Sequence, residues 1–280
     1  MKIQTAINKA FVELKKNDIK FPLLDCEILM SKALNKNREF IVLNLDQELK
    51  KEKYFYFQEL IKERSRGKPV AYITGKKHFW KDEFYVNENV LIPRPDTEII
   101  IEQVLEIFKN RSNITFLEIG VGSGCILLSI LKEKKKFLGF GIDLCNKSLK
   151  VCKINAFKLG VNNRVKLFKY DVDNFTLGKY DLIISNPPYI KKLDLKYLDK
   201  DVINFEPNLA LNGGIEGLSE IRKVINRSSD LIKKNGKLIL EIGFDQKNDV
   251  ERLLIKKGFY INKVVKDLAK NNRCIISTKI

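Results

Sequence analysis

Four consecutive residues, Asn186, Pro187, Pro188 and Tyr189, follow an apolar stretch and suit chemistry on a planar NH₂ group. The nitrogen of an amide or an aniline is a poor nucleophile because its lone pair is delocalised. The side-chain oxygen of Asn186 and the carbonyl oxygen of Pro187 can accept the two N–H bonds of such a group and turn its lone pair towards an electrophile. Consecutive prolines stiffen the loop, and Tyr189 can lie against the planar group and exclude water. We predict catalytic roles for Asn186, Pro187 and Tyr189, with Pro188 completing the substrate-binding loop; the alternative is a proline-rich turn with Tyr189 in the core.

A second motif is a glycine-rich turn, with Gly120, Gly122 and Gly124 directly after a buried apolar stretch. Glycines are typical of a turn where a ligand approaches the backbone closely. The dinucleotide fingerprint G-x-G-x-x-G would require a third glycine at position 125, where this chain has Cys125 instead. Glu118 precedes the turn, where its carboxylate would repel a pyrophosphate but would suit a cofactor that carries an ammonium and a sulfonium group. S-adenosylmethionine fits that description.

Two further acidic positions follow in order along the chain. Asp143 lies 23 residues after Gly120, at the end of the next apolar stretch, where a carboxylate can bind both ribose hydroxyls. Asp171 and Val172 follow the third stretch, where a methyltransferase fold would hold an adenine; each acid alone could also be a solvated strand end. The residues predicted to bind the cofactor are Glu118, Gly120, Val121, Gly122, Ser123, Gly124, Asp143, Asp171, Val172 and Asn186.

The elements that must position these residues alternate between strand and helix patterns. Strands are predicted over 115–120, 137–143, 164–170, 180–185, 236–243 and 274–279, and helices over 124 onwards, 147–159, 216–234 and 246–257. Alternation of this kind predicts an α/β fold with a mostly parallel sheet covered by helices on both faces. Ligands of such folds bind beyond the carboxyl ends of the strands, where the motifs fall.

The region before residue 98 has a different pattern. Residues 1–75 show apolar residues at three- and four-residue spacing, which predicts a small helical domain. From residue 77 the period changes, and the triplet 87–89 is predicted to be the turn of a β-hairpin, so 76–97 reads as a hairpin linker. Asp96 or Thr97 can cap a helix over 99–108. The predicted division is 1–75, 76–97 and 98–280.

Composition excludes several classes of protein. No apolar run is long enough to cross a bilayer, and the first 20 residues have no signal-peptide core, so a cytoplasmic protein is expected. The five cysteines form no CxxC pair and His78 is the only histidine, so no metal site is expected. The net charge of +17 comes from 42 lysines and only 10 arginines, spread along the chain. Because nucleic-acid recognition favours arginine, this charge does not decide the substrate.

The chain resembles the PrmC/HemK family of N5-glutamine methyltransferases, which modify the GGQ glutamine of class 1 peptide chain release factors. The resemblance covers nearly the whole chain, and its specific pieces are GKPVAYITGKKHFW, VLIPRPDTE, LEIGVGSG, SNPPYI, FEPNLALNGGIEGL and LILEIGFDQ. It implies a Rossmann-like class I methyltransferase domain with a seven-stranded sheet, S-adenosylmethionine bound by Gly120–Gly124 and Asp143, and a substrate amide held by Asn186–Tyr189. It also implies that residues 1–75 help to dock the release factor.

The chain departs from the family at two positions. Val172 stands where the family often has a bulky aromatic residue beside the adenine, and Phe175 is a candidate substitute. Glu118 replaces a common aspartate. We expect a monomer that makes no stable complex with nucleic acid or membrane.

Three other functions are compatible with parts of the pattern. A sister family methylates a glutamine of a ribosomal protein, although it usually diverges just after the Pro-Arg of the segment 92–98. A DNA or RNA amino-methyltransferase would need residues to extract and stack the base, and no such segment stands out. The third alternative is a catalytically inactive module that binds S-adenosylmethionine and a partner, and the intact Asn186 and Glu118 argue against it.

Overall fold

Two units share the chain, and one of them is discontinuous in sequence. The computed structural model describes residues 1–280. A helical unit comprises Met1–Lys76 and Asp199–Phe205, and an α/β unit comprises Lys77–Leu198 and Glu206–Ile280. The hairpin that was expected to form a separate linker belongs almost wholly to the α/β unit. The sequence did not indicate that Asp199–Phe205 would join the helical unit.

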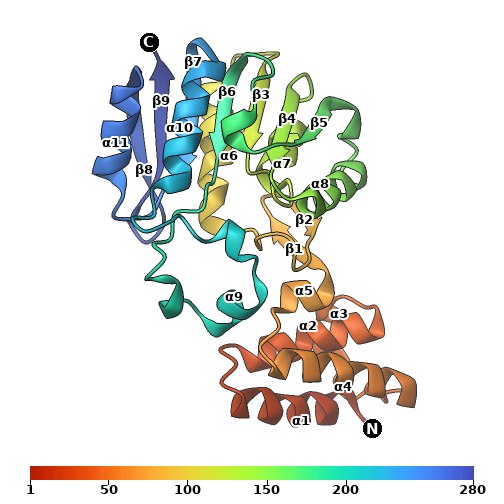
Figure 1. The fold of residues 1–280 in the computed structure, drawn as a ribbon. Helices are drawn as coiled ribbons and strands as arrows, with labels where there is room; N and C mark the ends of the chain where they lie inside the picture. Colours follow the sequence, from red (N-terminus) through yellow and green to blue (C-terminus); the bar gives the residue numbers. More distant parts are fainter. The chain divides into compact units, whose positions relative to one another are not determined.

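The helical unit consists of short helices around one apolar core (Figure 1). Its elements are α1 (Ile3–Lys16), α2 (Pro22–Leu34), α3 (Arg38–Leu43), α4 (Lys51–Ser65), α5 (Val70–Thr74) and α9 (Lys200–Phe205). The stripe predicted for the first helix lies in this core, because Ile7, Ala10 and Leu14 are buried. None of the helices in the chain combines the length and the apolar composition needed to cross a bilayer.

The segment Asp199–Phe205 is tied to the helical unit by ion pairs. The buried guanidinium of Arg64 donates to Asp25 at 2.7 Å and to Asp201 at 2.9 Å. Lys20 pairs with Asp199 at 2.7 Å. Burial outweighs the Arg64 charge and raises the pKa of Asp25. One buried arginine therefore links helices α2, α4 and α9.

The β-hairpin forms between β1 (Lys76–Phe79) and β2 (Asp82–Tyr85), so its turn lies at residues 80–81 and the prediction of a hairpin centred on 87–89 was wrong. Residues 87–90 do form a turn, in which the Asn87 side chain accepts from Asn89 N. No second strand follows it, because the Asn155 side chain binds both the N–H (2.7 Å) and the carbonyl (2.9 Å) of Tyr85 and ends the ladder. Residues 90–94 continue as an extended segment.

The α/β unit is built on a seven-stranded sheet with the order β5-β4-β3-β6-β7-β9-β8. Strands β5, β4, β3, β6 and β7 are parallel, and β9 is antiparallel to both β7 and β8. The predicted mostly parallel α/β sheet is confirmed. The strands are β3 (Thr115–Ile119), β4 (Leu138–Asp143), β5 (Val165–Lys169), β6 (Tyr180–Ser185), β7 (Ile232–Glu241), β8 (Phe259–Lys266) and β9 (Asn272–Lys279). The helices are α6 (Glu98–Ile107), α7 (Cys125–Glu133), α8 (Asn146–Lys158), α10 (Ser219–Leu231) and α11 (Lys247–Lys256), with 3₁₀ turns η1 (Pro95–Thr97), η2 (Asn162–Arg164), η3 (Val172–Asn174), η4 (Leu195–Tyr197) and η5 (Asn208–Ala210).

Each face of the sheet carries its own core, since successive side chains of a strand point to opposite faces. Leu182 and Ile184 of β6 pack in one cluster with α6, α7 and α8. Ile183 packs in the other cluster with α10 and α11, which lie side by side across one face in Figure 1. Burial on both faces explains why the parallel strands are almost continuously apolar.

Candidate active site

The predicted motifs meet at one edge of the sheet because three neighbouring parallel strands end there together. Ile119 at the end of β3 is in register with Ile142 of β4 and with Ser185 of β6. Ser185 also donates from Oγ to the carbonyl of Ile119 at 2.8 Å. The residues that follow, including Gly120 and Asn186, are therefore brought side by side, as expected for the carboxyl ends of an α/β sheet.

A cavity of about 420 Å³ opens at this edge, a volume typical of small-molecule sites. It brings together most of the residues predicted from the sequence, namely Glu118, Gly120, Val121, Gly122, Ser123, Asp143, Asp171, Val172, Asn186, Pro187 and Pro188. Gly124 and Tyr189, which were also predicted, are not part of its wall.

The three glycines of the turn have different roles. A side chain at Gly120 or Gly122 would meet no atom of the protein within 4 Å, so the open side of both residues faces free space at the cavity wall. A Cβ at Gly124 would instead lie 2.6 Å from Cys152 Sγ and 2.8 Å from Leu128 Cδ1. Gly124 is thus needed for the packing of α7 against α8, whereas Gly120 and Gly122 leave room for a ligand.

Glu118 supplies a buried acid at the cavity wall with no basic partner. Its Oε2 accepts from Leu127 N at 2.8 Å. Burial, together with the Asp143 charge, raises the pKa of Glu118 well above its usual range, and the Leu127 N–H offsets this only in part. A ligand that places positive charge in the cavity would stabilise the ionised carboxylate. The cation-bearing methionine end of S-adenosylmethionine fits this wall.

Asp143, predicted to bind the ribose, is held in place at the cavity wall. Its two carboxylate oxygens accept from Gly122 N at 2.9 Å and Cys145 N at 2.8 Å, which fixes the side chain against the glycine-rich turn. Each carboxylate oxygen has a further lone pair for a hydroxyl donor. Burial raises the pKa of Asp143 despite these two bonds.

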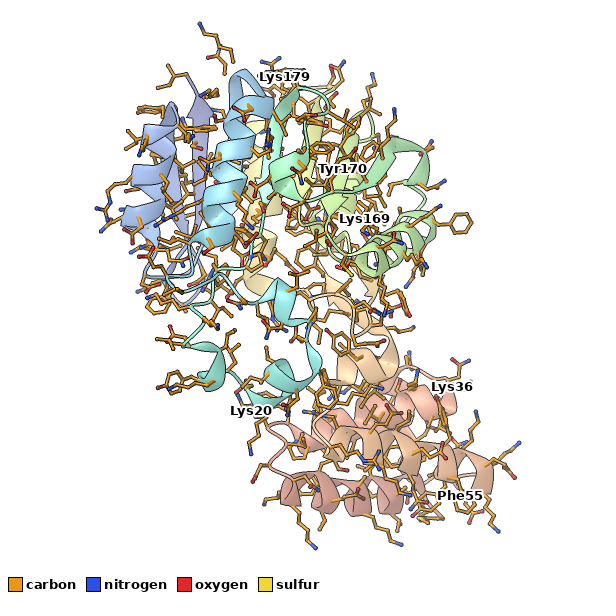
Figure 2. All side chains as sticks on the ribbon, viewed as in Figure 1. Lys20, Lys36, Phe55, Lys169, Tyr170 and Lys179 are labelled. Carbon is orange, nitrogen blue, oxygen red and sulfur yellow. The ribbon has the colours of Figure 1, made fainter.

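The apolar wall beyond Asp143 is formed by Val172 and Tyr170. Phe175, the candidate substitute for the missing aromatic, is fully buried and packs against Phe168 and Tyr170 beneath this wall, so that suggestion was wrong. Tyr170 is 40% exposed and is labelled beside Lys169 in Figure 2. Tyr170 therefore places an aromatic side chain in the same cavity wall as Val172.

Gln246 and the segment that contains Gly213 and Gly217 hold the Asn186–Tyr189 loop in place. The sequence did not reveal a role for either. Gln246 Nε2 donates to the Tyr189 carbonyl at 2.9 Å and to the Gly217 carbonyl at 3.0 Å. Gly213 lies so close that a Cβ there would be 2.8 Å from the Pro188 carbonyl oxygen. The glycines of the sequence NGGIEGL were the available signal, because they permit this close backbone approach.

Neither predicted acceptor of the loop is used by the protein. The Asn186 side-chain oxygen and the Pro187 carbonyl oxygen accept no hydrogen bond from any other residue. The Asn186 Nδ2 group is engaged, because it donates to Thr97 Oγ1 at 3.3 Å. Asn186 and Pro187 both line the cavity, and each therefore has an oxygen that the protein leaves available as an acceptor.

Thr97 and Glu241 complete the surroundings of the loop, and both were missed as site residues. Thr97 was predicted as a helix cap, but its side chain makes no capping bond to α6. Its hydroxyl donates instead to Glu241 Oε2 at 2.7 Å. Tyr189 donates to Glu241 Oε1 at 3.2 Å and accepts from Arg273 at 3.4 Å. These bonds direct the Tyr189 hydroxyl towards Glu241, at the end of β7.

The fold and the cavity define a class I methyltransferase whose methyl donor is S-adenosylmethionine. A solved methyltransferase from Pyrococcus furiosus superposes with a TM-score of 0.54 over 79% of this chain and 97% of that chain, at 18% sequence identity. A likeness at this identity shows the fold alone.

The relatives define the family. Residues 5–75 match the PrmC N-terminal domain, and residues 97–215 match the methyltransferase small domain. Release factor glutamine methyltransferases of Caulobacter vibrioides and Clostridium acetobutylicum are 37% and 35% identical, over 95% and 100% of this chain and 92% and 99% of theirs. The chain belongs to the release factor glutamine methyltransferase family. It is also 32% identical to a bifunctional methyltransferase of Rickettsia conorii, but it spans only 58% of that longer protein.

Proposed function

We propose that the chain transfers a methyl group from S-adenosylmethionine to the side-chain amide nitrogen, N5, of the glutamine in the GGQ motif of class 1 peptide chain release factors. The observation that carries this proposal is the pair of unused acceptors, Asn186 Oδ1 and Pro187 O, beside a cavity whose buried acid lacks a cation. The relatives named as release factor glutamine methyltransferases support the choice of substrate.

The residues of the loop bind and orient the amide. Asn186 and Pro187 accept its two N–H bonds, so its nitrogen presents the lone pair to the cavity. Pro187 and Pro188 restrict the backbone, which keeps the acceptors in place before the substrate arrives. When bound, S-adenosylmethionine supplies an electrophilic methyl group on a sulfonium. Glu118 and Asp143 hold the two ends of that ligand, and no histidine base is needed.

We also propose how the rest of the molecule contributes. The helical unit helps to dock the release factor, in keeping with its match to the PrmC N-terminal domain. The protein acts as a monomer in the cytoplasm, where release factors are found, and it forms no stable complex with nucleic acid.

The experiment that tests the proposal is methyl transfer from radiolabelled S-adenosylmethionine to a purified release factor. A release factor with the GGQ glutamine replaced by asparagine is the matched control. We expect label in the first protein only, on a single glutamine identified by mass spectrometry. Ribosomal proteins and DNA are parallel substrates. Label in either of these, with none in the release factor, would overturn the proposal.

A further inference from the structure

A chain of hydrogen bonds, buried at Thr97 and Glu241, runs from the acceptor loop to the end of β7. Asn186 Nδ2 donates to Thr97 Oγ1 at 3.3 Å, and Thr97 Oγ1 donates to Glu241 Oε2 at 2.7 Å. Thr97 and Glu241 are each only 2% exposed. Thr97 comes from η1, Asn186 from the loop after β6, and Glu241 from β7, so three elements meet at this chain.

The chain has a fixed direction. A hydroxyl has one proton, and Thr97 uses its proton in the bond to the Glu241 carboxylate. The Thr97 oxygen can then only accept from Asn186. The NH₂ end of the Asn186 amide must therefore face Thr97, and its oxygen must face the opposite way.

We propose that Thr97 and Glu241 are positioning residues that hold the Asn186 amide with its oxygen available to the substrate NH₂ group. This inference rests on the proposed function, because it explains how that acceptor is selected. If the amide were turned over, it would present a donor to a substrate group that also donates, and the two would repel each other. In this scheme neither residue supplies an acceptor to the substrate: Thr97 acts through Asn186, and Glu241 acts through Thr97 and Tyr189.

Glu241 is held firmly enough to fix this direction. Its second oxygen accepts from Tyr189 at 3.2 Å, and Tyr189 accepts in turn from Arg273 at 3.4 Å. Arg273 is anchored by Asp267 at 2.9 Å. Hydroxyl donors occupy both Glu241 oxygens, as a buried carboxylate requires. The same residue thereby also sets the position of the Tyr189 ring.

The test replaces the hydroxyl and then restores it. Thr97→Val keeps the shape of the side chain but removes both bonds, whereas Thr97→Ser keeps the hydroxyl and is the matched control. With a GGQ-containing peptide, we expect Thr97→Val to lower kcat roughly 10- to 100-fold. KM should change much less, and Thr97→Ser should remain within about threefold of the wild type. The affinity for S-adenosylhomocysteine, measured by calorimetry, should be unchanged in both variants.

A second readout does not depend on activity. In protein labelled with ¹⁵N-asparagine, the Asn186 side-chain NH₂ signal is identified by its loss in Asn186→Ala. We expect its hydrogen exchange to be slow in the wild type and in Thr97→Ser, and faster in Thr97→Val. Glu241→Gln provides a further variant, in which the enforced direction is lost and exchange should also accelerate.

The outcomes separate the two proposals. A Thr97→Val protein with wild-type kcat and a protected Asn186 amide would overturn the positioning role, whatever the substrate. A wild type that leaves the peptide glutamine unmethylated would overturn the proposed function, and the exchange measurement would still decide the positioning role. Urea unfolding of each variant shows whether a loss reflects misfolding; if Thr97→Val is unfolded, Glu241→Gln carries the test.

Discussion

Two buried glutamates near the site show how the surroundings of a side chain decide its use. Glu118 accepts one backbone N–H, and no basic side chain lies near enough to affect its pKa. Glu241 is bound by the hydroxyls of Thr97 and Tyr189 and lies close to the Arg273 charge. The protein satisfies Glu241 and leaves Glu118 for a cationic ligand. This difference fits the proposed roles of Glu118 in cofactor binding and of Glu241 in the placement of the acceptor loop.

Replacing the acceptor itself gives a prediction at the scale of one residue. Asn186→Ala removes the side-chain oxygen that orients the substrate NH₂ group but leaves Glu118 and Asp143 in place. We expect kcat to fall by roughly 10²- to 10³-fold, the usual cost of losing one preorganised polar group. The dissociation constant for S-adenosylmethionine, measured by calorimetry, should change by less than about threefold. Joint loss of cofactor binding and activity would contradict this division of roles.

The pH dependence of kcat follows from Glu241. Burial outweighs the bonds from Thr97 and Tyr189 and the Arg273 charge, and raises the pKa of Glu241 to about 7. Above this pH the carboxylate is ionised and must receive the Thr97 proton; below it, a protonated Glu241 can donate to Thr97, whose hydroxyl can then donate to Asn186. We expect kcat at saturating cofactor to decrease as the pH falls through about 7. In Thr97→Val we expect kcat to show no such decrease.

Other groups near Glu241 do not explain such a decrease in kcat. Burial raises the pKa of Tyr189, Cys125 and Cys274, so these groups stay protonated across this range. Arg273 stays charged, because Tyr189, Asp267 and Glu241 raise its pKa despite burial. Asp96 is the remaining charged neighbour, and Asp96→Asn is the matched control. If the decrease in kcat shifts to another pH in Asp96→Asn but persists in Thr97→Val, protonation of Glu241 is not its cause.

At the scale of elements, the sequence predicted the strands and helices that depend on apolar periodicity, but it misplaced the hairpin that was inferred from the turn triplet 87–89. The alternating pattern predicted parallel strands and placed Gly120, Asp143 and Asn186 at their carboxyl ends, because apolar runs and their order along the chain can be read from the sequence. The antiparallel strand β8 was missed, since Phe259–Lys266 carries polar residues on its exposed side. Thr97 was read as a cap because threonine commonly caps helices, and only the fold brings Glu241 to it.

The packing of α7 yields a prediction that separates strain from contact. Gly122 and Gly124 have positive φ values of 53° and 81°, so alanine is strained at both positions, by roughly 1–2 kcal/mol. Only at Gly124 would the methyl group also collide, with Cys152 and Leu128. We expect Gly124→Ala to lower the free energy of unfolding by about 1–3 kcal/mol more than Gly122→Ala, as measured in urea.

Cofactor binding should show the reverse order of effects. The new methyl group of Gly122→Ala would project into the space at the cavity wall, so this variant should bind S-adenosylmethionine more weakly. Gly124→Ala, where folded, should bind it nearly as well as the wild type. Equal losses of stability in the two variants would mean that α7 can shift to accommodate the extra atom.

At the scale of the whole molecule, the helical unit is completed by residues from the second half of the chain. Ten residues after the acceptor loop ends, Asp199–Phe205 joins the unit formed by Met1–Lys76. Arg64 bonds Asp201, Lys20 bonds Asp199, and Gly67 lies against the Phe205 ring. The helical unit therefore cannot reach its full set of contacts until the chain beyond the Asn-Pro-Pro-Tyr loop has been made.

A fragment of residues 1–76 should accordingly be less stable than the same fragment joined to residues 199–205 by a flexible linker. In the shorter fragment Asp25 is the only carboxylate left to Arg64, which also donates to the Lys68 carbonyl, and the surface near Gly67 that Phe205 covers faces water. We expect a lower urea midpoint for it, and an intermediate midpoint for the linked fragment with Asp201→Asn. Since Asp201 is partly exposed, its pair with Arg64 should contribute on the order of 1 kcal/mol. Equal urea midpoints for all three fragments would mean that Met1–Lys76 is fully stable alone and that Asp199–Phe205 adds no stability to it.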